Sequence, residues 1–215
     1  ELGIDQNTLI IFNSDNGAHG KGGSLEFFKS SGKLKGKKRE MYDGGIRSPM
    51  FAYWPGSIKA GTTSEHVSAF WDMLPTFSEL TAEPIVGETD GISLLPTLLG
   101  NPKEQKQHRH LYWELYEGVP NSAVRYGKWK AVVLNRRKKL DIELYNLETD
   151  PCESENIANQ HPEIVEKMKN FMNNSHQTNP FWDASNSPLF NADAAAKANG
   201  VKADYSNPYY KPQKK

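Results

Sequence analysis

Two adjacent side chains with hard oxygen donors, Asp15 and Asn16, give the sequence its clearest chemical signal. They belong to the Ser-Asp-Asn-Gly run at residues 14–17, here called the oxygen-donor segment. Carboxylate and amide oxygens favour Ca²⁺ or Mg²⁺ over zinc, which prefers His or Cys. Calcium takes about six to eight ligands, so the remaining ones must come from elsewhere in the fold. The alternative, a strand-ending Asx turn, stays open for so short a motif.

A second group of interest combines lysines with paired glycines at residues 34–49, here called the lysine–glycine segment. Its sequence is Leu-Lys-Gly-Lys-Lys-Arg-Glu-Met-Tyr-Asp-Gly-Gly-Ile-Arg-Ser-Pro. Paired glycines let the backbone approach closely, and a lysine in a shielded pocket can bind an anion or stabilise a leaving oxygen. A solvated basic face is the ordinary alternative, and for this segment alone it is the simpler explanation. That face would consist of Lys33, Lys35, Lys37 and Arg39.

A continuous β-branched and aromatic run at residues 8–12 leads into the oxygen-donor segment. Such a run predicts a strand buried on both faces of a parallel α/β sheet, and functional groups collect at the carboxyl ends of such strands. Gly17 would allow the tight turn that follows. Because the chain has few comparable strands, we expect sequence upstream of Glu1 to supply much of this sheet.

The elements farther along the chain predict a second, smaller unit. Residues 17–38 predict a long polar loop, and residues 47–54 predict an extended apolar stretch. Asp72 is expected to be the N-cap of a helix that reaches Leu80. Four short aromatic and β-branched runs predict a roughly four-stranded antiparallel sheet, and residues 162–173 predict an amphipathic helix. The four runs are residues 111–116, 122–126, 129–134 and 143–146.

The predicted fold class is α/β, in two parts and a tail. Residues 1–107 are expected to form part of a sheet domain, and residues 108–175 a small α+β subdomain with the antiparallel sheet and a helix. Residues 176–215 are expected to be an irregular tail. Three aromatic side chains are expected to hold that tail in place: Phe181, Trp182 and Tyr209.

Composition excludes several function classes. The 215 residues include 26 Lys plus Arg and 26 Asp plus Glu, so the formal net charge is zero and a nucleic-acid partner is disfavoured. The single cysteine, Cys152, excludes an internal disulfide framework and a four-cysteine zinc site. No apolar run approaches the ~20 residues that span a bilayer, so no membrane segment is expected.

In this order and spacing, the two segments closely resemble the type I sulfatases from residue 7 to residue 55. The resemblance extends to Asp-Met-Leu-Pro-Thr at residues 72–76 and to Asp-Gly-Ile-Ser at residues 90–93. Residues 144–158, which contain Leu-Tyr-Asn-Leu-Glu-Thr-Asp-Pro, are similar to the C-terminal subdomain of that family. The resemblance covers roughly residues 1–175, and its motifs are specific in combination.

The resemblance implies an alkaline-phosphatase-like α/β domain, a small antiparallel C-terminal subdomain and one Ca²⁺ in the active site. It also implies that a formylglycine hydrate, made from a Cys or Ser, attacks the sulfur of a sulfate ester. By position, Asp15 and Asn16 match two metal ligands, and Lys38 matches the catalytic lysine that contacts the sulfate. Lys37 is the alternative in register. His19 is a candidate substrate contact, with an ordinary loop histidine as the alternative.

The sequence departs from the family in one large respect. The formylglycine sequence, Cys or Ser followed by x-Pro-x-Arg, does not occur in it, and Cys152 does not match. The metal-binding aspartates, lysine and histidines that accompany this sequence in the family are also absent. We therefore interpret the chain as the C-terminal portion of a sulfatase and expect it to be inactive alone. Its partner would be the N-terminal part of the same enzyme or a second copy, and the resemblance implies secretion or export to the periplasm.

Two other functions stay open at this point. One is hydrolysis of phosphate or phosphonate esters by an enzyme of the same superfamily, although Asn16 stands where two-zinc phosphatases have a histidine ligand. The other is a non-catalytic module that binds sulfated glycans through residues 29–39 and 136–139. For a sulfatase, the sequence leaves aryl, steroid and glycan sulfates equally open as substrates.

Overall fold

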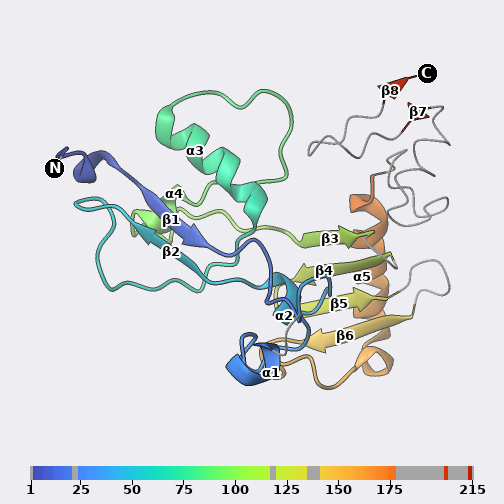
Figure 1. Ribbon diagram of the computed structural model, residues 1–215. Coiled ribbons are helices and arrows are strands. Elements are labelled where there is room, and N and C mark those ends of the chain that lie inside the picture. Colours follow the sequence, from blue (N-terminus) through green and yellow to red (C-terminus); the bar gives the residue numbers. More distant parts are fainter. Residues whose placement is uncertain are drawn as a thin grey trace. The chain divides into compact units, whose positions relative to one another are not determined.

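Two compact units make up the chain. Unit 1 comprises Glu1–Asp15 and Ser48–Leu111, and unit 2 comprises Asn16–Arg47 and Tyr112–Lys215. Figure 1 shows their helices and strands. The computed structural model describes residues 2–20, 24–116, 120–134, 141–177, 201–202 and 213–214.

Unit 1 combines a two-stranded sheet with short helices. β1 (Ile10–Asn13) pairs antiparallel with β2 (Met50–Tyr53), and Phe12 lies opposite Phe51. β2 confirms the extended stretch expected at residues 47–54. The helical elements are η1 (Asp5–Asn7), η3 (Phe70–Asp72), α3 (Met73–Thr81) and α4 (Leu95–Leu98).

The strand predicted at residues 8–12 is present as β1, and the parallel neighbours expected from sequence upstream of Glu1 stay a prediction. Within the described residues, its one partner strand is the antiparallel β2. Phe12 is 68% exposed and Phe51 is 65% exposed, so the side chains of this sheet are not buried on both faces within unit 1. A continuous apolar run indicates that a strand can be covered on both sides, but it does not encode the direction of the neighbouring strand.

Asp72 starts α3 as predicted, but its carboxylate does not cap that helix. The fully buried side chain accepts hydrogen bonds from the backbone N–H groups of Ala69, at 2.7 Å, and Ile92, at 2.9 Å. The Nε2 atom of His108 lies 2.8 Å from Asp72 Oδ1. Asp72 therefore joins the start of α3 to two distant loop segments, which a local capping rule does not predict.

Two half-buried histidines should make unit 1 sensitive to acid. Burial lowers the pKa of His66 and of His110 below the ordinary value of 6.5, and the nearby Asp72 opposes the shift at His66. Because the unfolded chain binds protons on these imidazoles first, stability should be lost as the pH falls through about 6.5. We expect His66→Gln to reduce the drop in melting temperature between about pH 7.5 and about pH 5.5. A drop in His66→Gln that equals the drop in the wild type would contradict the assignment.

Unit 2 is built on the sheet predicted for the C-terminal part of the sequence. Its four strands lie in the order β3-β4-β5-β6, and both β4–β5 and β5–β6 are antiparallel. The strands are β3 (Leu111–Leu115), β4 (Asn121–Tyr126), β5 (Trp129–Val133) and β6 (Ile142–Asn146). The predicted helix is α5 (Pro162–Ser175), which ends two residues later than expected. The α+β subdomain is thereby confirmed.

The two faces of this sheet carry different structures. Val133 and Leu144 pack with Met168 of α5 on one face. Val132 and Tyr145 pack with Tyr42 on the other, because neighbouring side chains of a strand point to opposite faces. The lysine–glycine segment therefore covers the sheet face opposite α5.

The grouping of residues 16–47 with this sheet differs from the sequence-based division, which placed them with the preceding α/β part. Long-range contacts that connect the lysine–glycine segment to the sheet account for the difference. The division at residues 107 and 108 stays a prediction.

In the tail, β7 (Val201–Lys202) pairs with β8 (Gln213–Lys214). The aromatic residues expected to hold the tail in place lie outside the described residues; they are Phe181, Trp182 and Tyr209. In the described part of the chain, no helix is both long and apolar enough to cross a membrane.

Candidate active site

Backbone hydrogen bonds bring the two chemically interesting segments together. The Gly17 N–H donates to Gly45 O over 2.8 Å, and the Lys38 N–H donates to Ala18 O over 2.9 Å. Gly45 belongs to α2 (Asp43–Ile46), a four-residue helix in the lysine–glycine segment. The backbone that follows Asn16 is therefore bonded to both α2 and the turn that contains Lys38.

Glycines allow this close approach. A Cβ atom on Gly17 would lie 1.8 Å from Gly44 O, and one on Gly44 would lie 2.3 Å from Gly36 O. A Cβ atom on Gly45 would lie 2.1 Å from Glu40 O. Each distance is far below van der Waals contact with a backbone atom, so any side chain here would force the backbone apart. The packing explains why both segments contain glycine at these positions.

The candidate site residues differ in their surroundings. Asn16 and Lys38 are half-buried, whereas Asp15 and His19 are exposed. Lys37 is exposed, and its Nζ lies 4.0 Å from Glu40 Oε1. The structure thus joins the backbones near Asn16 and Lys38 within unit 2, and Asp15 precedes Asn16 as the last residue of a unit 1 segment.

The donor set of Asp15 and Asn16 fits part of a calcium shell. One carboxylate and one amide oxygen match the hard ligands that Ca²⁺ prefers, but calcium takes about six to eight of them. Among the residues with described positions, no three or more His, Cys, Asp or Glu side chains are placed to hold a metal ion. Further ligands outside this set are therefore needed for a complete site.

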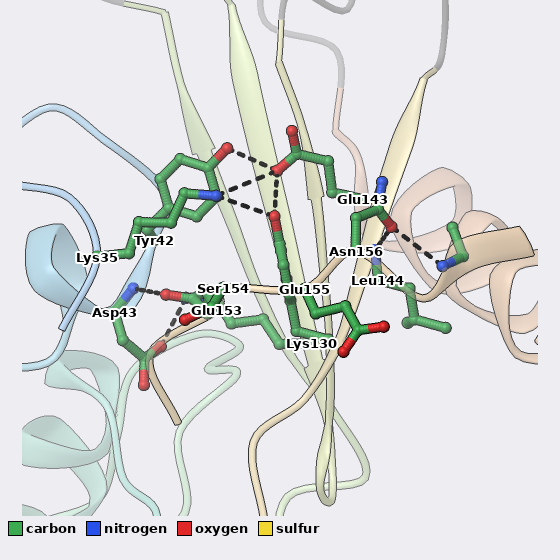
Figure 2. Close-up of polar contacts among 12 residues, drawn as sticks. Lys35, Tyr42, Asp43, Lys130, Glu143, Leu144, Glu153, Ser154, Glu155 and Asn156 are labelled. Atoms are coloured by element: carbon green, nitrogen blue, oxygen red, sulfur yellow. Dashed lines mark hydrogen bonds and ion pairs between the residues drawn. The ribbon is translucent and has the colours of Figure 1, made fainter. Parts of the chain in front are cut away.

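A buried ion cluster lies beneath α2 (Figure 2). Lys130 of β5 is fully buried, with its Nζ 2.6 Å from Asp43 Oδ1 and 2.8 Å from Glu153 Oε1. The second oxygen of Glu153 accepts a 2.6 Å hydrogen bond from the Asp43 N–H, the first amide of α2. Arg47 Nη1 lies 3.6 Å from Asp43 Oδ2. Lys130 thus lies between two buried carboxylates, and the largely exposed Arg47 adds a second positive charge beside Asp43.

The charge of Glu153 depends on this pairing. Burial raises the pKa of the Glu153 carboxyl, and the contacts with Lys130 oppose that shift. Removing one member of a buried ion pair typically costs about 3–5 kcal/mol, because the partner is left as an uncompensated buried charge. The cluster therefore resists any change that separates α2 from β5.

Two tyrosines and a lysine form a neighbouring cluster around Glu143 (Figure 2). Glu143 Oε2 accepts hydrogen bonds from the hydroxyl groups of Tyr42, at 2.6 Å, and Tyr145, at 2.7 Å. Lys35 Nζ donates to the Tyr145 hydroxyl over 3.0 Å and lies 3.9 Å from the centre of the Tyr42 ring. Burial, reinforced by Glu143, raises the pKa of both tyrosines, so both stay protonated donors at neutral pH. These contacts attach the residue before α2 to β6.

Sequence reasoning missed Asp43, Lys130 and Glu153 as a cluster. One signal was available, because Lys130 lies inside an apolar run that predicts a buried strand, and a buried lysine requires an acidic partner. The partner itself could not be identified, since Asp43 lies 87 positions away along the chain. Cys152, beside Glu153, is a partly buried free cysteine, consistent with an ordinary loop residue.

Comparisons with known proteins identify the family to which the chain belongs. Residues 36–178, well over half of the chain, match a family model described as N-sulphoglucosamine sulphohydrolase, C-terminal. Arylsulfatase A of Homo sapiens is 33% identical over 198 residues, which cover 79% of this chain and 38% of that protein. N-acetylgalactosamine-6-sulfatase of Mus musculus is 33% identical over 164 residues, which cover 73% of this chain and 29% of that protein.

A solved structure of similar fold is the crystal structure of Ps i-CgsB, which is 26% identical with a TM-score of 0.65. The match covers 84% of this chain and 39% of that chain. The chain thus spans less than half the length of the relatives it matches. On the strength of the family model and these relatives, the chain belongs to the sulfatase family and corresponds to its C-terminal part.

Proposed function

We propose that the protein containing this chain is a sulfuric ester hydrolase, in which Asp15 and Asn16 are calcium ligands and Lys38 contacts the sulfate group. The observation that carries the proposal is the pair of backbone hydrogen bonds, Gly17 to Gly45 and Lys38 to Ala18, in a chain of the sulfatase family. They support a site in which one oxygen donor and one lysine are held by the same packed backbone. By the same resemblance, we propose export from the cytoplasm.

Lys38 would act on the charge of the sulfate group. Its ammonium group would bind the sulfate oxygens and stabilise the charge that grows on them and on the leaving oxygen as the sulfur–oxygen bond breaks. Ca²⁺, when bound beside Asp15 and Asn16, would supply further positive charge to the same oxygens. Lys37 is less suited to this role, because it is exposed and faces the carboxylate of Glu40.

The nucleophile must come from outside residues 1–215, since they contain no Cys or Ser followed by x-Pro-x-Arg. We place the formylglycine in an N-terminal part of the same enzyme, in keeping with relatives that extend well beyond the matched region. His19 is a secondary candidate for substrate contact, because its exposed side chain follows the oxygen-donor segment closely. A two-zinc phosphoesterase is less well supported, because an amide oxygen at position 16 is a poor zinc ligand.

The calcium assignment can be tested in the complete enzyme. Asp15→Ala should lower both bound calcium, measured by atomic emission, and hydrolysis of an aryl sulfate, because it removes a charged ligand. Asp5→Ala is the matched control, since Asp5 is also an exposed unit 1 carboxylate but lies outside the oxygen-donor segment. Unchanged calcium content and activity in Asp15→Ala would reject the assignment. Heparin binding that survives this change while hydrolysis is absent in the wild type would favour a glycan-binding module.

A further inference from the structure

We propose that the buried Lys130–Glu153 pair is a positioning element for the active site, through which the C-terminal sheet fixes Asn16 and Lys38. The inference rests on the proposed function, and it assigns a role to two residues that contact neither metal nor substrate. It is carried by an unbroken series of contacts within unit 2, which runs from β5 through α2 to the oxygen-donor segment.

The first contacts in this series fix both the backbone and the side chain of Asp43. Glu153 accepts the Asp43 N–H over 2.6 Å, and Lys130 lies 2.6 Å from Asp43 Oδ1. Tyr42, at the N-cap position, makes no side-chain capping bond. The first backbone N–H of α2, which has no acceptor within the helix, donates instead to Glu153, 110 positions away along the chain. Figure 2 shows Asp43, Lys130 and Glu153 directed toward one another. The N-terminus of α2 is therefore held at two atoms by two different side chains.

The next contacts transmit that position to the candidate site. Gly44 N–H donates to Lys35 O over 2.7 Å, and Gly45 O accepts the Gly17 N–H. Asp43, Gly44 and Gly45 are all buried, and the space around each glycine is too small for a Cβ atom. A packed backbone of this kind cannot shift at one end without displacing its neighbours. Movement of Asp43 would therefore displace the segment that carries Asn16 and the loop that carries Lys38.

The chemistry of the pair favours positioning over stabilisation. A buried ion pair contributes little net stability compared with apolar side chains of the same volume, whereas it accepts only a narrow range of orientations. Glu153 also has a φ of 54°, a left-handed conformation uncommon for a residue with a long side chain. The chain tolerates this strained conformation at the point where the carboxylate must reach both Lys130 and the Asp43 N–H.

The experiment uses the complete enzyme and three readouts. In Glu153→Ala, the metal-free protein should exchange the Gly17 amide hydrogen faster relative to the amides of β5, because its acceptor on Gly45 moves. Calcium affinity, measured by titration calorimetry, should fall about 10–100-fold, as for lost outer-shell partners of metal ligands. The kcat for an aryl sulfate should fall about 10²-fold, with a smaller change in KM. Glu153→Gln, which keeps an acceptor for the Asp43 N–H, should recover most of the calcium affinity.

Met168→Ala is the matched control. Met168 is fully buried but packs between the sheet and α5, on the face away from α2. The Met168→Ala variant should have a lower melting temperature. The relative exchange of the Gly17 amide, the calcium affinity and the kcat of the folded protein should be unchanged. Should Glu153→Ala fail to fold, Glu153→Asp keeps the charge and suits a left-handed conformation, but shortens the reach to Asp43. It should still weaken calcium binding and speed exchange at Gly17.

The outcomes separate this inference from the proposed function. If Glu153→Ala or Glu153→Asp behaves like Met168→Ala in all three readouts, the positioning role is wrong, while the calcium and lysine assignments stand. If Asp15→Ala and Lys38→Ala both leave hydrolysis and calcium binding unchanged, the proposed roles of Asp15 and Lys38 are wrong. In that case faster exchange of the Gly17 amide in Glu153→Ala would still show that the Lys130–Glu153 pair positions the oxygen-donor segment. The pair would then have no role in catalysis.

Discussion

Replacing Lys38 with alanine in the complete enzyme is expected to lower kcat by about 10²-fold or more, the effect of removing one preorganised donor from a transition state. The Lys38 backbone is fixed by its bond to Ala18, so its side chain starts from a defined position beside the oxygen-donor segment. No ion pair between Lys38 and an acidic side chain occurs among the residues the structure describes. The ammonium group is therefore available for a sulfate oxygen. Steady-state kinetics with an aryl sulfate at saturating calcium measure the effect.

Lys37→Ala is the natural control for this prediction. Lys37 carries the same charge one position away, but it is exposed and lies 4.0 Å from the Glu40 carboxylate. An exposed pair of this kind contributes about 0–1 kcal/mol to stability, so its removal should change kcat only slightly. Loss of activity in Lys37→Ala with no effect of Lys38→Ala would show that the register is off by one residue. Equal small effects of both would favour a solvated basic face.

The C-terminal sheet could be predicted from the sequence because its signals are local. Short β-branched and aromatic runs separated by turns predict β4 and β5, whose loop needs only Gly127 and Lys128. The helical spacing of apolar residues predicts α5, and the structure buries Met168 and Phe171 there as that spacing requires. In both cases the residues that determine the strand or helix lie within that strand or helix.

Pairings between distant segments could not be predicted in the same way. The apolar run of β1 indicates a strand, but its antiparallel partner β2 depends on the course of the chain between them. Likewise, Asp72 has the type and position of an N-cap, yet its carboxylate binds Ile92 and His108 instead. An acidic side chain takes whichever donors the fold brings to it, and sequence spacing does not record those donors.

The same difference between local signals and long-range contacts applies to the residues of the candidate site. Asp15, Asn16 and Lys38 could be proposed because they lie in short motifs with a recognisable order. Glu153 and Lys130 could not, because their role exists only through contacts with Asp43, a residue far from both in sequence. The family resemblance suggested the candidate site residues, whereas the contacts that connect the C-terminal sheet to them could be found only in the three-dimensional structure.

The 215-residue chain alone is expected to show no sulfatase turnover. Ester cleavage at sulfur needs an activated oxygen nucleophile, and no Cys or Ser here has the sequence context for formylglycine. In its proposed role Lys38 would bind a sulfate group but could not attack it, and the two proposed oxygen ligands would leave a calcium shell incomplete. The expected result is a rate with an aryl sulfate and calcium that equals the buffer blank. Turnover that follows the chain through every purification step would overturn this interpretation.

The same chain is expected to associate with itself or with the N-terminal part of the enzyme. Unit 1 exposes large apolar side chains on both its sheet and α3, and such surfaces are normally covered by another part of a protein. They belong to Ile10, Phe12, Phe51, Tyr53, Leu74 and Phe77. The open edges of a two-stranded sheet add unpaired backbone groups that can extend the sheet. Sedimentation velocity should therefore show species larger than 24.2 kDa, and Phe12→Lys with Phe51→Lys should shift them toward the monomer. A wild-type chain that stays monomeric at all concentrations would show that these apolar side chains need no partner.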